Sequence, residues 1–192
     1  LLHKQWSEGW LAQGSYTWSW LRGNYAGLFR PETEQLDPHI NSDFDLKSLT
    51  QNRTGSLPFD RTHQFKVFAA REFQTAYDTR FTLGGGGQAI SGAPSNYFGS
   101  HALYGGDEVF ILPRGSGERL PWMFSADAHM GFTITPAKGH ALELTVDVFN
   151  LFNFQAATLL DETYTESDVN PLQNCVEGTR DSCTTADLGG LA

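Results

Sequence analysis

Apolar and polar side chains alternate along several stretches of the chain, beginning near its start. Between positions 10 and 20 every even residue is apolar or glycine, and the odd residues Gln13, Ser15 and Thr17 are polar. Because consecutive side chains of a β-strand point to opposite faces, this period of two predicts a strand with one apolar and one polar face. The same period returns in four further stretches. We therefore predict an all-β fold of about five antiparallel strands, near residues 9–22, 61–73, 79–91, 120–134 and 141–153.

The connections between the predicted strands alternate in length. Residues 74–78 and 135–140 form tight turns, and the other connections are long. Outer-membrane β-barrels have short periplasmic turns at one end and long extracellular loops at the other, and connections of this length are uncommon in compact soluble domains. We therefore expect part of a large transmembrane β-barrel that does not close on its own. Its extracellular loops would lie near residues 23–60, 92–119 and 154–192.

A soluble β-sandwich would show the same alternation, so other features must decide whether the apolar face contacts lipid or a protein core. The apolar face contains small residues such as Ala12, Ala69 and Gly85, which would fill a protein core poorly and which lipid tolerates. Aromatic residues gather near the strand ends, as in the girdles of membrane barrels. The expected girdle comprises Trp10, Trp18, Trp20, Phe73, Phe81, Trp122, Phe132 and Phe152. The alternative is a soluble extracellular β-sandwich that binds a ligand, or mediates adhesion, through its loops.

The polar faces of the predicted strands would line the lumen of the barrel. The candidate lumen-facing residues are Lys66, Glu72, Asp127, His129, Glu143 and Asp147. The simplest interpretation is a hydrated wall stabilised by cross-strand pairs. For His129, a hydrogen-bonded wall residue is favoured over a metal ligand, because no second His stands at ligand spacing.

Composition and charge exclude several classes of function. The 192 residues suffice for one ordinary domain, and no run of about 18 apolar residues occurs that would form a spanning helix. A net charge of -9 with scattered Lys and Arg argues against a nucleic-acid partner. The sequence contains no phosphate-binding loop, zincin, hydrolase-elbow or zinc-ribbon motif. We therefore expect no catalytic residues, no metal site, no cofactor and no enzyme activity.

Two cysteines stand in the last long connection. Cys175 and Cys183 have seven residues between them, and in an exported protein this favours a disulfide over free thiols. The neighbouring acids Glu177 and Asp181 oppose a reactive thiolate. The connection has seven acids against one base, Arg180, and we interpret these acids as solvated rather than as a site for cations.

Residues 41–45 imitate the start of a calcium-binding loop. Position six of that loop would be Leu46 where Gly is required, and position twelve would be Asn52 where Glu is required. The sequence therefore rejects an EF-hand, and solvated acids are the favoured interpretation of this segment as well.

Six segments resemble, in the same order, the C-terminal barrel region of TonB-dependent outer-membrane receptors, in particular the Oar-like subgroup known from myxobacteria and related Gram-negative bacteria. The segments are GSYTWSWLRGNYAGLF, LDPHINSDFDLKSL, NRTGSLPFDRTHQFKVFAAREF, ALYGGDEVFILPRGSGERLPW, LTVDVFNLFN and DETYTESDVNP. They extend over residues 6–171, so the resemblance covers nearly the whole chain. The ordered set is specific, whereas VFNLFN alone is only moderately so.

The resemblance implies a barrel of about 22 strands with a plugged lumen, in the bacterial outer membrane. Its function would be uptake of a ligand or, as in Oar-like members, export or display. Its partners would be outer-membrane lipid, the remaining barrel strands, the plug domain, the TonB complex and an extracellular ligand. The sequence shows no plug, TonB-contacting box or final aromatic-ended strand, so we expect it to be a piece of a longer protein. An open sheet leaves its edges unpaired, and the piece should be stable only within the full barrel.

Overall fold

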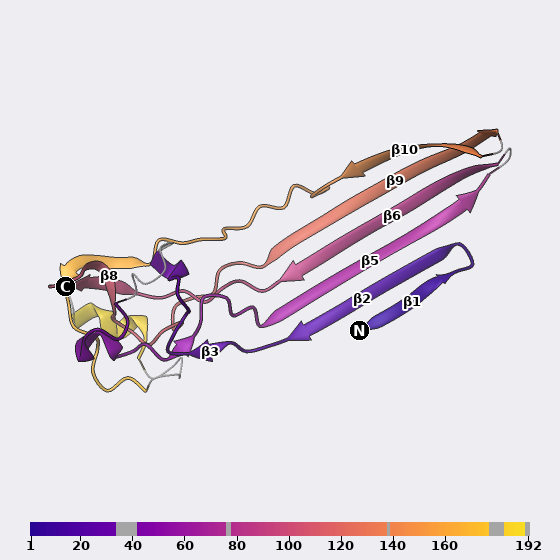
Figure 1. Ribbon diagram of the computed structural model, residues 1–192. Helices are drawn as coiled ribbons and strands as arrows, with labels where there is room; N and C mark the ends of the chain where they lie inside the picture. The colour runs from indigo at the N-terminus through magenta and orange to yellow at the C-terminus, as the bar shows by residue number, and fades with distance from the viewer. Residues whose placement is uncertain (34–41, 76–77, 138, 177–182, 191–192) are drawn as a thin grey trace. The chain divides into compact units, whose positions relative to one another are not determined.

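The computed structural model describes residues 1–33, 42–75, 78–137, 139–176 and 183–190 (Figure 1). By its internal contacts the chain divides into two compact units, which we call the sheet unit and the loop unit. The sheet unit comprises Leu1–Trp18, His63–Ser91 and Trp122–Ala156. The loop unit comprises Ser19–Thr62, Gly92–Pro121 and Ala157–Ala192. Each unit is therefore assembled from segments that lie far apart in the sequence.

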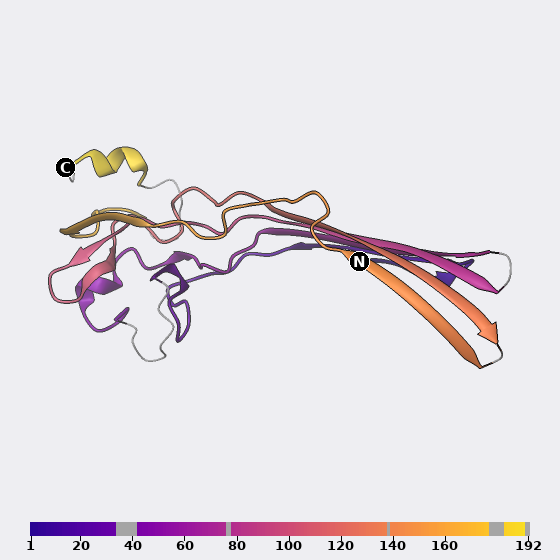
Figure 2. The same cartoon turned by 90° about the horizontal axis from the view of Figure 1, so that it is seen from above.

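The sheet unit is one antiparallel sheet of six strands in the order β1-β2-β5-β6-β9-β10 (Figure 1). The strands are β1 (Leu2–Ser7), β2 (Trp10–Trp18), β5 (His63–Gln74), β6 (Thr79–Ile90), β9 (Met123–Ala137) and β10 (His140–Val148). Figure 2 shows the sheet nearly edge-on, as a single twisted layer. The all-β, antiparallel prediction is confirmed, and the sheet is open, with β1 and β10 at its edges.

Each strand of the sheet is joined to its hairpin partner by a tight turn. Between β1 and β2, Glu8 and Gly9 have φ angles of 54° and 75°. Two consecutive residues with positive φ form the type of two-residue turn whose twist matches that of a hairpin. Gly9 also accepts a hydrogen bond from the Glu72 amide, N···O 2.7 Å, so this turn is tied to β5.

The structure differs from the sequence predictions at four strand positions. β9 runs from Met123 to Ala137 rather than from residue 120 to 134, and it extends into the predicted turn at 135–140 because Ala137 still pairs with His140 of β10. β1 was not predicted, because Lys4 interrupts the apolar positions Leu2 and Trp6. β2 ends at Trp18 rather than at residue 22, since the Leu21 amide donates to Asp60 Oδ1 at 2.7 Å, a side chain instead of a strand partner. β10 ends at Val148 rather than at residue 153, because the chain turns at Asn150.

The loop unit contains short elements where the sequence predicted only loops. These are β3 (Arg22–Gly23), β4 (Gly55–Ser56), β7 (Phe98–His101), β8 (Gly105–Phe110) and β11 (Thr163–Asp168), with 3-10 helices η1 (Pro31–Thr33), η2 (Lys47–Thr50) and η3 (Thr185–Gly190). β11 pairs with β7 in parallel, and β7 pairs with β8 in an antiparallel hairpin. No helix among the described residues is long and apolar enough to cross a membrane.

The buried apolar side chains of the described residues all belong to the loop unit. They are Leu49, Ala93, Phe98, Val109, Phe110, Ile111, Leu112, Cys183 and Leu188. The sheet unit therefore has no protein core, and its apolar side chains remain exposed, as for Val67 (62%) and Leu144 (67%).

Candidate functional site

One face of the sheet is polar, and the strand register defines its members. Lys66 lies opposite Ser15 and Gln88, and Glu72 lies opposite Thr82. Because side chains alternate between faces, these positions share a face with the polar residues of β9 and β10. All six candidate lumen-facing residues therefore lie on one face: Lys66, Glu72, Asp127, His129, Glu143 and Asp147. Their exposure to a lumen remains a prediction.

Cross-strand pairs hold part of this polar face together. His129 Nδ1 lies 2.7 Å from Asp147 Oδ1, on the neighbouring strand. Arg80 Nη1 lies 3.7 Å from Glu72 Oε2. Such exposed pairs contribute modestly to stability, and they fit the interpretation of a wall held by cross-strand pairs.

Phe68 is an aromatic residue on this otherwise polar face. It lies opposite Gly86, and a Cβ built at Gly86 would stand 3.5 Å from Phe68 Cδ2. The missing side chain of Gly86 therefore leaves room for the ring. Phe68 was not predicted to lie on this face, because the run Phe68–Ala69–Ala70 interrupts the alternation of apolar and polar residues and the glycine opposite Phe68 is 18 positions away in the sequence.

Aromatic rings form two rows on the opposite, apolar face. Phe73, Phe81 and Phe132 lie side by side in register near the tight turns. At the other end, Tyr16 stacks on Phe65 with ring centroids 4.6 Å apart. Trp122 continues this second row between Phe65 and Phe124, with centroid distances of 6.3 Å to each.

The expected girdle residues are distributed unequally between the units. Trp10, Phe73, Phe81 and Phe132 lie on strands near the tight turns, while Trp18 ends β2 and Trp122 precedes β9. Phe152 follows β10 and contacts Phe154, centroids 5.7 Å apart. Trp20 lies in the loop unit, beyond the end of β2. Their location at a membrane interface remains a prediction.

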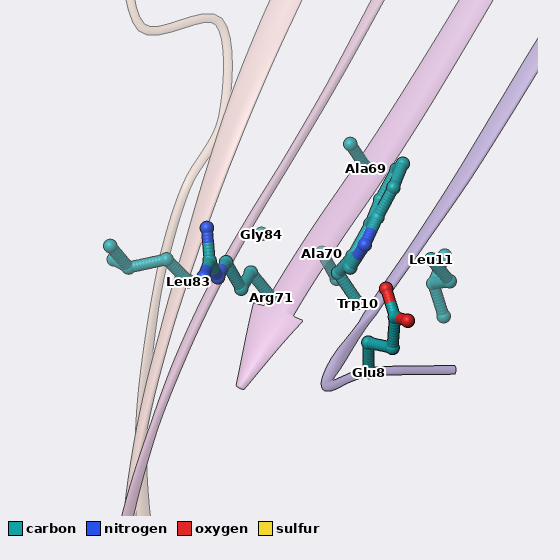
Figure 3. A pocket seen from close by; sticks show the side chains of 8 residues that line it. All are labelled: Glu8, Trp10, Leu11, Ala69, Ala70, Arg71, Leu83 and Gly84. Carbon is teal, nitrogen blue, oxygen red and sulfur yellow. The ribbon is translucent and has the colours of Figure 1, made fainter. Parts of the chain in front are cut away.

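Between the two aromatic rows the apolar face is built from small residues, and it is hollowed. Ala12, Ala69, Gly85 and Ala128 lie side by side in register. A hollow of about 860 Å³ lies over this region. A second hollow of about 620 Å³ lies towards the tight turns (Figure 3). It is bordered by Glu8, Trp10, Leu11, Ala69, Ala70, Arg71, Leu83 and Gly84.

The loop unit is held together by a buried network of charges. Asp43 is fully buried, with Arg30 Nε at 3.5 Å and Arg114 Nη2 at 3.7 Å, and it also pairs with Arg53. Arg30 Nη1 donates to Glu108 Oε2 at 2.7 Å. The guanidinium groups of Arg53 and Arg114 lie 4.9 Å and 4.6 Å from the ring centroid of Phe110.

Burial and the neighbouring positive charges of Arg30 and Arg114 lower the pKa of Arg53 to about 9. Asp43, part of the segment that imitates a calcium loop, therefore takes arginines as partners instead of a metal. Asn41, at the start of that segment, lies outside the described residues.

An acidic hollow of about 320 Å³ also lies within the loop unit. It is bordered by Glu32, Phe98, Asp107, Leu159, Leu160, Asp161, Glu162 and Thr163. Burial raises the pKa of Glu162 to about 7, and the charges of Glu32 and Asp107 act in the same direction. Asn96 Nδ2 donates to Glu162 Oε2 at 2.6 Å. Among the described residues, no group of three or more His, Cys, Asp and Glu is arranged to bind a metal.

Cys175 and Cys183 form a disulfide in the structure, with an S–S distance of 2.06 Å. Cys183 belongs to a small core with Ile111, Leu112 and Leu188. The disulfide thus joins the segment containing η3 to Cys175, and apolar packing places both cysteines against residues that follow β8. Glu177, Arg180 and Asp181, which gave the last connection part of its charge, lie outside the described residues.

Comparison with known proteins gives one strong match. The chain is 53% identical, over 171 residues, to the TonB-dependent transporter Oar of Myxococcus xanthus. The match covers 89% of this chain and 16% of that transporter, so the chain spans a small part of its relative's length. No protein-family model matches the chain, and no solved structure matches it. The likeness to TonB-dependent receptors that the sequence motifs indicated is confirmed: the chain is homologous to a segment of a TonB-dependent transporter.

Proposed function

We propose that this chain is a section of the barrel wall of a TonB-dependent transporter in the bacterial outer membrane. In this proposal the apolar face of the sheet contacts lipid and the polar face lines the lumen. The relative is named a TonB-dependent transporter, and nothing in the sequence motifs suggests catalysis, so the proposed role is transport rather than an enzymatic reaction.

One observation carries this proposal: an extended apolar face of the sheet unit is exposed in the described part of the chain. Exposed side chains include Phe65, Val67, Phe124, Leu142 and Leu144, from strands throughout the sheet. Soluble monomers rarely expose contiguous apolar patches larger than a few hundred Å². A β-sandwich would bury this face under a second sheet, and no second sheet of the sheet unit covers it. Lipid is the environment that such a face requires.

The open edges indicate that the wall continues beyond this chain. β1 and β10 each pair with a strand on one side and have no described partner on the other. In hydrocarbon each unpaired backbone group would cost several kcal/mol. We propose that further strands of the full-length protein pair with both edges and close the barrel, with a plug domain inside it and with coupling to the TonB complex through parts outside this chain.

We propose that the loop unit is extracellular and contributes to ligand capture. Its sequence segments are the three long connections, and each follows the end of a strand opposite to the tight turns. The buried charge network and the disulfide give these connections a fixed fold, which supports a binding surface better than unstructured loops would. The ligand passes across the outer membrane when the plug rearranges.

Spin-label accessibility in the full-length protein tests the orientation of the wall. One cysteine at a time is introduced at each of positions 142–147 of β10 and spin-labelled, and each labelled protein is reconstituted in lipid vesicles. Leu142, Leu144 and Val146 should be accessible to oxygen dissolved in lipid, whereas Glu143, Thr145 and Asp147 should be accessible to a water-soluble nickel chelate. The two native cysteines of this chain do not interfere, because both are in the disulfide, and any other cysteine of the full-length protein is replaced by serine beforehand.

Three outcomes would overturn the proposal. In a soluble sandwich the even positions would be inaccessible to both reagents, because protein would cover them. An accessibility pattern with no period of two would contradict the strand itself. Recovery of the full-length protein outside the outer-membrane fraction would also contradict the assignment.

A further inference from the structure

Two basic side chains stand on the apolar face of the sheet, close to the tight turns. Lys4 lies opposite Ala12, and Arg71 lies opposite Trp10 and Leu83, so the register places both on the face of Val67 and Leu144. A lysine or arginine on the lipid face costs about 2–4 kcal/mol at the middle of a bilayer and about 0–1 kcal/mol near its surface. Both residues lie beside the β1–β2 turn: Lys4 Nζ donates to the Ser7 carbonyl at 3.1 Å, and Arg71 lies opposite Trp10, the first residue of β2. Because barrel strands are tilted by about 35–45°, residues in one register row lie at different depths, and the β1 side of the sheet reaches the membrane surface in a different row from β9. Both residues should therefore lie at the depth of lipid headgroups.

Neither cation is neutralised by a carboxylate among the described residues. Lys4 Nζ lies 4.0 Å from the centroid of the Trp10 ring and donates to Ser7 Oγ at 2.7 Å. The Arg71 side chain forms no hydrogen bond or ion pair within the described part of the chain, and its guanidinium carbon lies 5.0 Å from the Phe73 centroid. In Figure 3 the Arg71 guanidinium lies on the side of Leu83, away from the carboxylate of Glu8, which lies near Trp10 and Leu11.

By contrast, Arg80 is a basic residue near the same turns but on the polar face. It lies opposite Gln74 and Thr133, and it pairs with Glu72 at 3.7 Å. Arg80 thus has a carboxylate partner, whereas Lys4 and Arg71 have none among the described residues. A negative charge opposite these two cations therefore has to come from outside the described residues.

The two cations adjoin the hollows of the apolar face. Lys4 and Trp10 border the larger hollow, and Arg71 and Trp10 border the one drawn in Figure 3. The larger hollow, about 860 Å³, lies within the range of about 300–1,000 Å³ that is typical of small-molecule sites. Ala12, Gly14 and Gly87 are among the small residues that border it, and Leu2 and Phe152 are among its bulky ones.

We propose that this surface binds one phospholipid of the membrane leaflet on the tight-turn side. Arg71 and Lys4 contact its phosphate on either side of Trp10, and an acyl chain lies in the hollow over the small residues. The charge complementarity selects this occupant, because a second apolar protein surface would leave both cations unpaired. The inference rests on the proposed function, which places this face in lipid.

Generic anchoring is the simpler account of the same residues. Lysine and arginine side chains near the ends of membrane segments extend towards the water interface and interact with many lipids in turn. A specific site differs in two respects that can be measured: the lipid is retained through purification, and retention depends on the hollow as well as on the charges.

The experiment uses the full-length protein, extracted from outer membranes in mild detergent and examined by native mass spectrometry. Dioleoylphosphatidylglycerol is titrated into the wild type and into four variants: Arg71→Gln, Lys4→Gln with Arg71→Gln, Gly14→Leu and the control Arg80→Gln. Gly14 suits the filling of the hollow, because a Cβ there would meet only Val67 Cγ1, at 3.9 Å. Heat-dependent migration in gel electrophoresis verifies that each variant is folded.

Wild type and Arg80→Gln should bind one phospholipid equally well. Arg71→Gln should bind it about fivefold more weakly and the double variant about thirtyfold, in line with about 1 kcal/mol for the attraction of each basic residue to anionic lipid. Gly14→Leu should weaken binding with all charges intact, and dioleoylglycerol, which lacks the phosphate, should not compete. Equal binding by all folded variants, or equal competition by dioleoylglycerol, would overturn the inference while leaving the protein in the outer-membrane fraction. Recovery outside that fraction would instead refute the proposed function.

Discussion

A lysine placed at the centre of the apolar face should destabilise the protein in a way that depends on both depth and face. Ala128 lies four residues from Phe124 and four from Phe132, which belong to the two aromatic rows, and it faces Gly85 and Val148 in register. From Phe124 to Phe132 the strand extends about 27 Å at about 3.4 Å per residue. At a tilt of about 40° this spans about 21 Å of membrane depth, comparable to the apolar band of about 25 Å in outer-membrane barrels. Ala128 should therefore lie near the bilayer midplane.

For Ala128→Lys we expect the free energy of unfolding to fall by about 2–4 kcal/mol, the cost of lysine at the midplane. This corresponds to about 30- to 700-fold in the folding equilibrium. Ile134→Lys, on the same face but beyond the Phe132 row, should cost about 0–1 kcal/mol. Ser125→Lys, on the polar face of the same strand, should change stability by about 0.5 kcal/mol or less.

The assay is urea unfolding of the full-length protein in lipid vesicles, followed by tryptophan fluorescence. All three substitutions add the same charge to the same strand, so only depth and face differ. If Ser125→Lys or Ile134→Lys lowered the free energy of unfolding as much as Ala128→Lys does, the assignment of the faces and of the aromatic rows would be refuted.

Three further predictions concern the loop unit. Asp43→Asn removes a buried charge that has three arginine partners, and it should lower the free energy of unfolding of the full-length protein, measured in urea, by about 3–5 kcal/mol. The control Asp45→Asn, at an exposed position, should change that free energy little. Cys175→Ser opens a disulfide whose cysteines are 8 positions apart, and should lower stability by about 2–3 kcal/mol in the absence of reductant; an unchanged transition would contradict a structural role for the disulfide. The pKa of Glu162 is raised from 4.5 to about 7, so its contribution to stability is complete below pH 4.5 and is lost as pH rises through 7. Glu162→Gln should therefore reduce the fall in melting temperature between pH 5 and pH 8, and an identical pH profile would show that Glu162 is not buried as described.

The strands of the sheet unit and their two faces could be predicted from the sequence, because one face of each strand differs in polarity from the other. Residues such as Val67, Leu144 and Asp147 follow a strict period of two, and the period fixes their faces without knowledge of the neighbours. Lys4 breaks that period in β1, since its environment at the end of the apolar face tolerates a cation. Phe68 breaks it in β5, because Gly86 on the adjacent strand makes room for its ring. In both cases the deciding contact lies on another strand.

The buried charge network of the loop unit could not be predicted in this way. Arg30 and Glu108 are 78 positions apart, and neither stands in a recognisable motif. Their sequence context resembles that of ordinary solvated loop residues, which is how the acids near Asp43 were interpreted. The structure corrects that interpretation for Asp43, which is fully buried. Only the fold of two distant connections brings these charges together.

The turn that follows β10 satisfies its own backbone groups. Asn150 Oδ1 accepts from the Phe154 amide at 2.9 Å, and Asn150 Nδ2 donates to the Phe154 carbonyl at 3.0 Å. Asp127 Oδ1 accepts from the Asn150 amide at 2.8 Å, and the Leu151 amide donates to the Ala126 carbonyl at 2.7 Å. One amide side chain thus takes the place of a strand partner where the chain leaves the sheet. As a result, the segment after residue 154 can gain or lose residues during evolution without shifting the register of the sheet, because β10 is closed off before that segment begins.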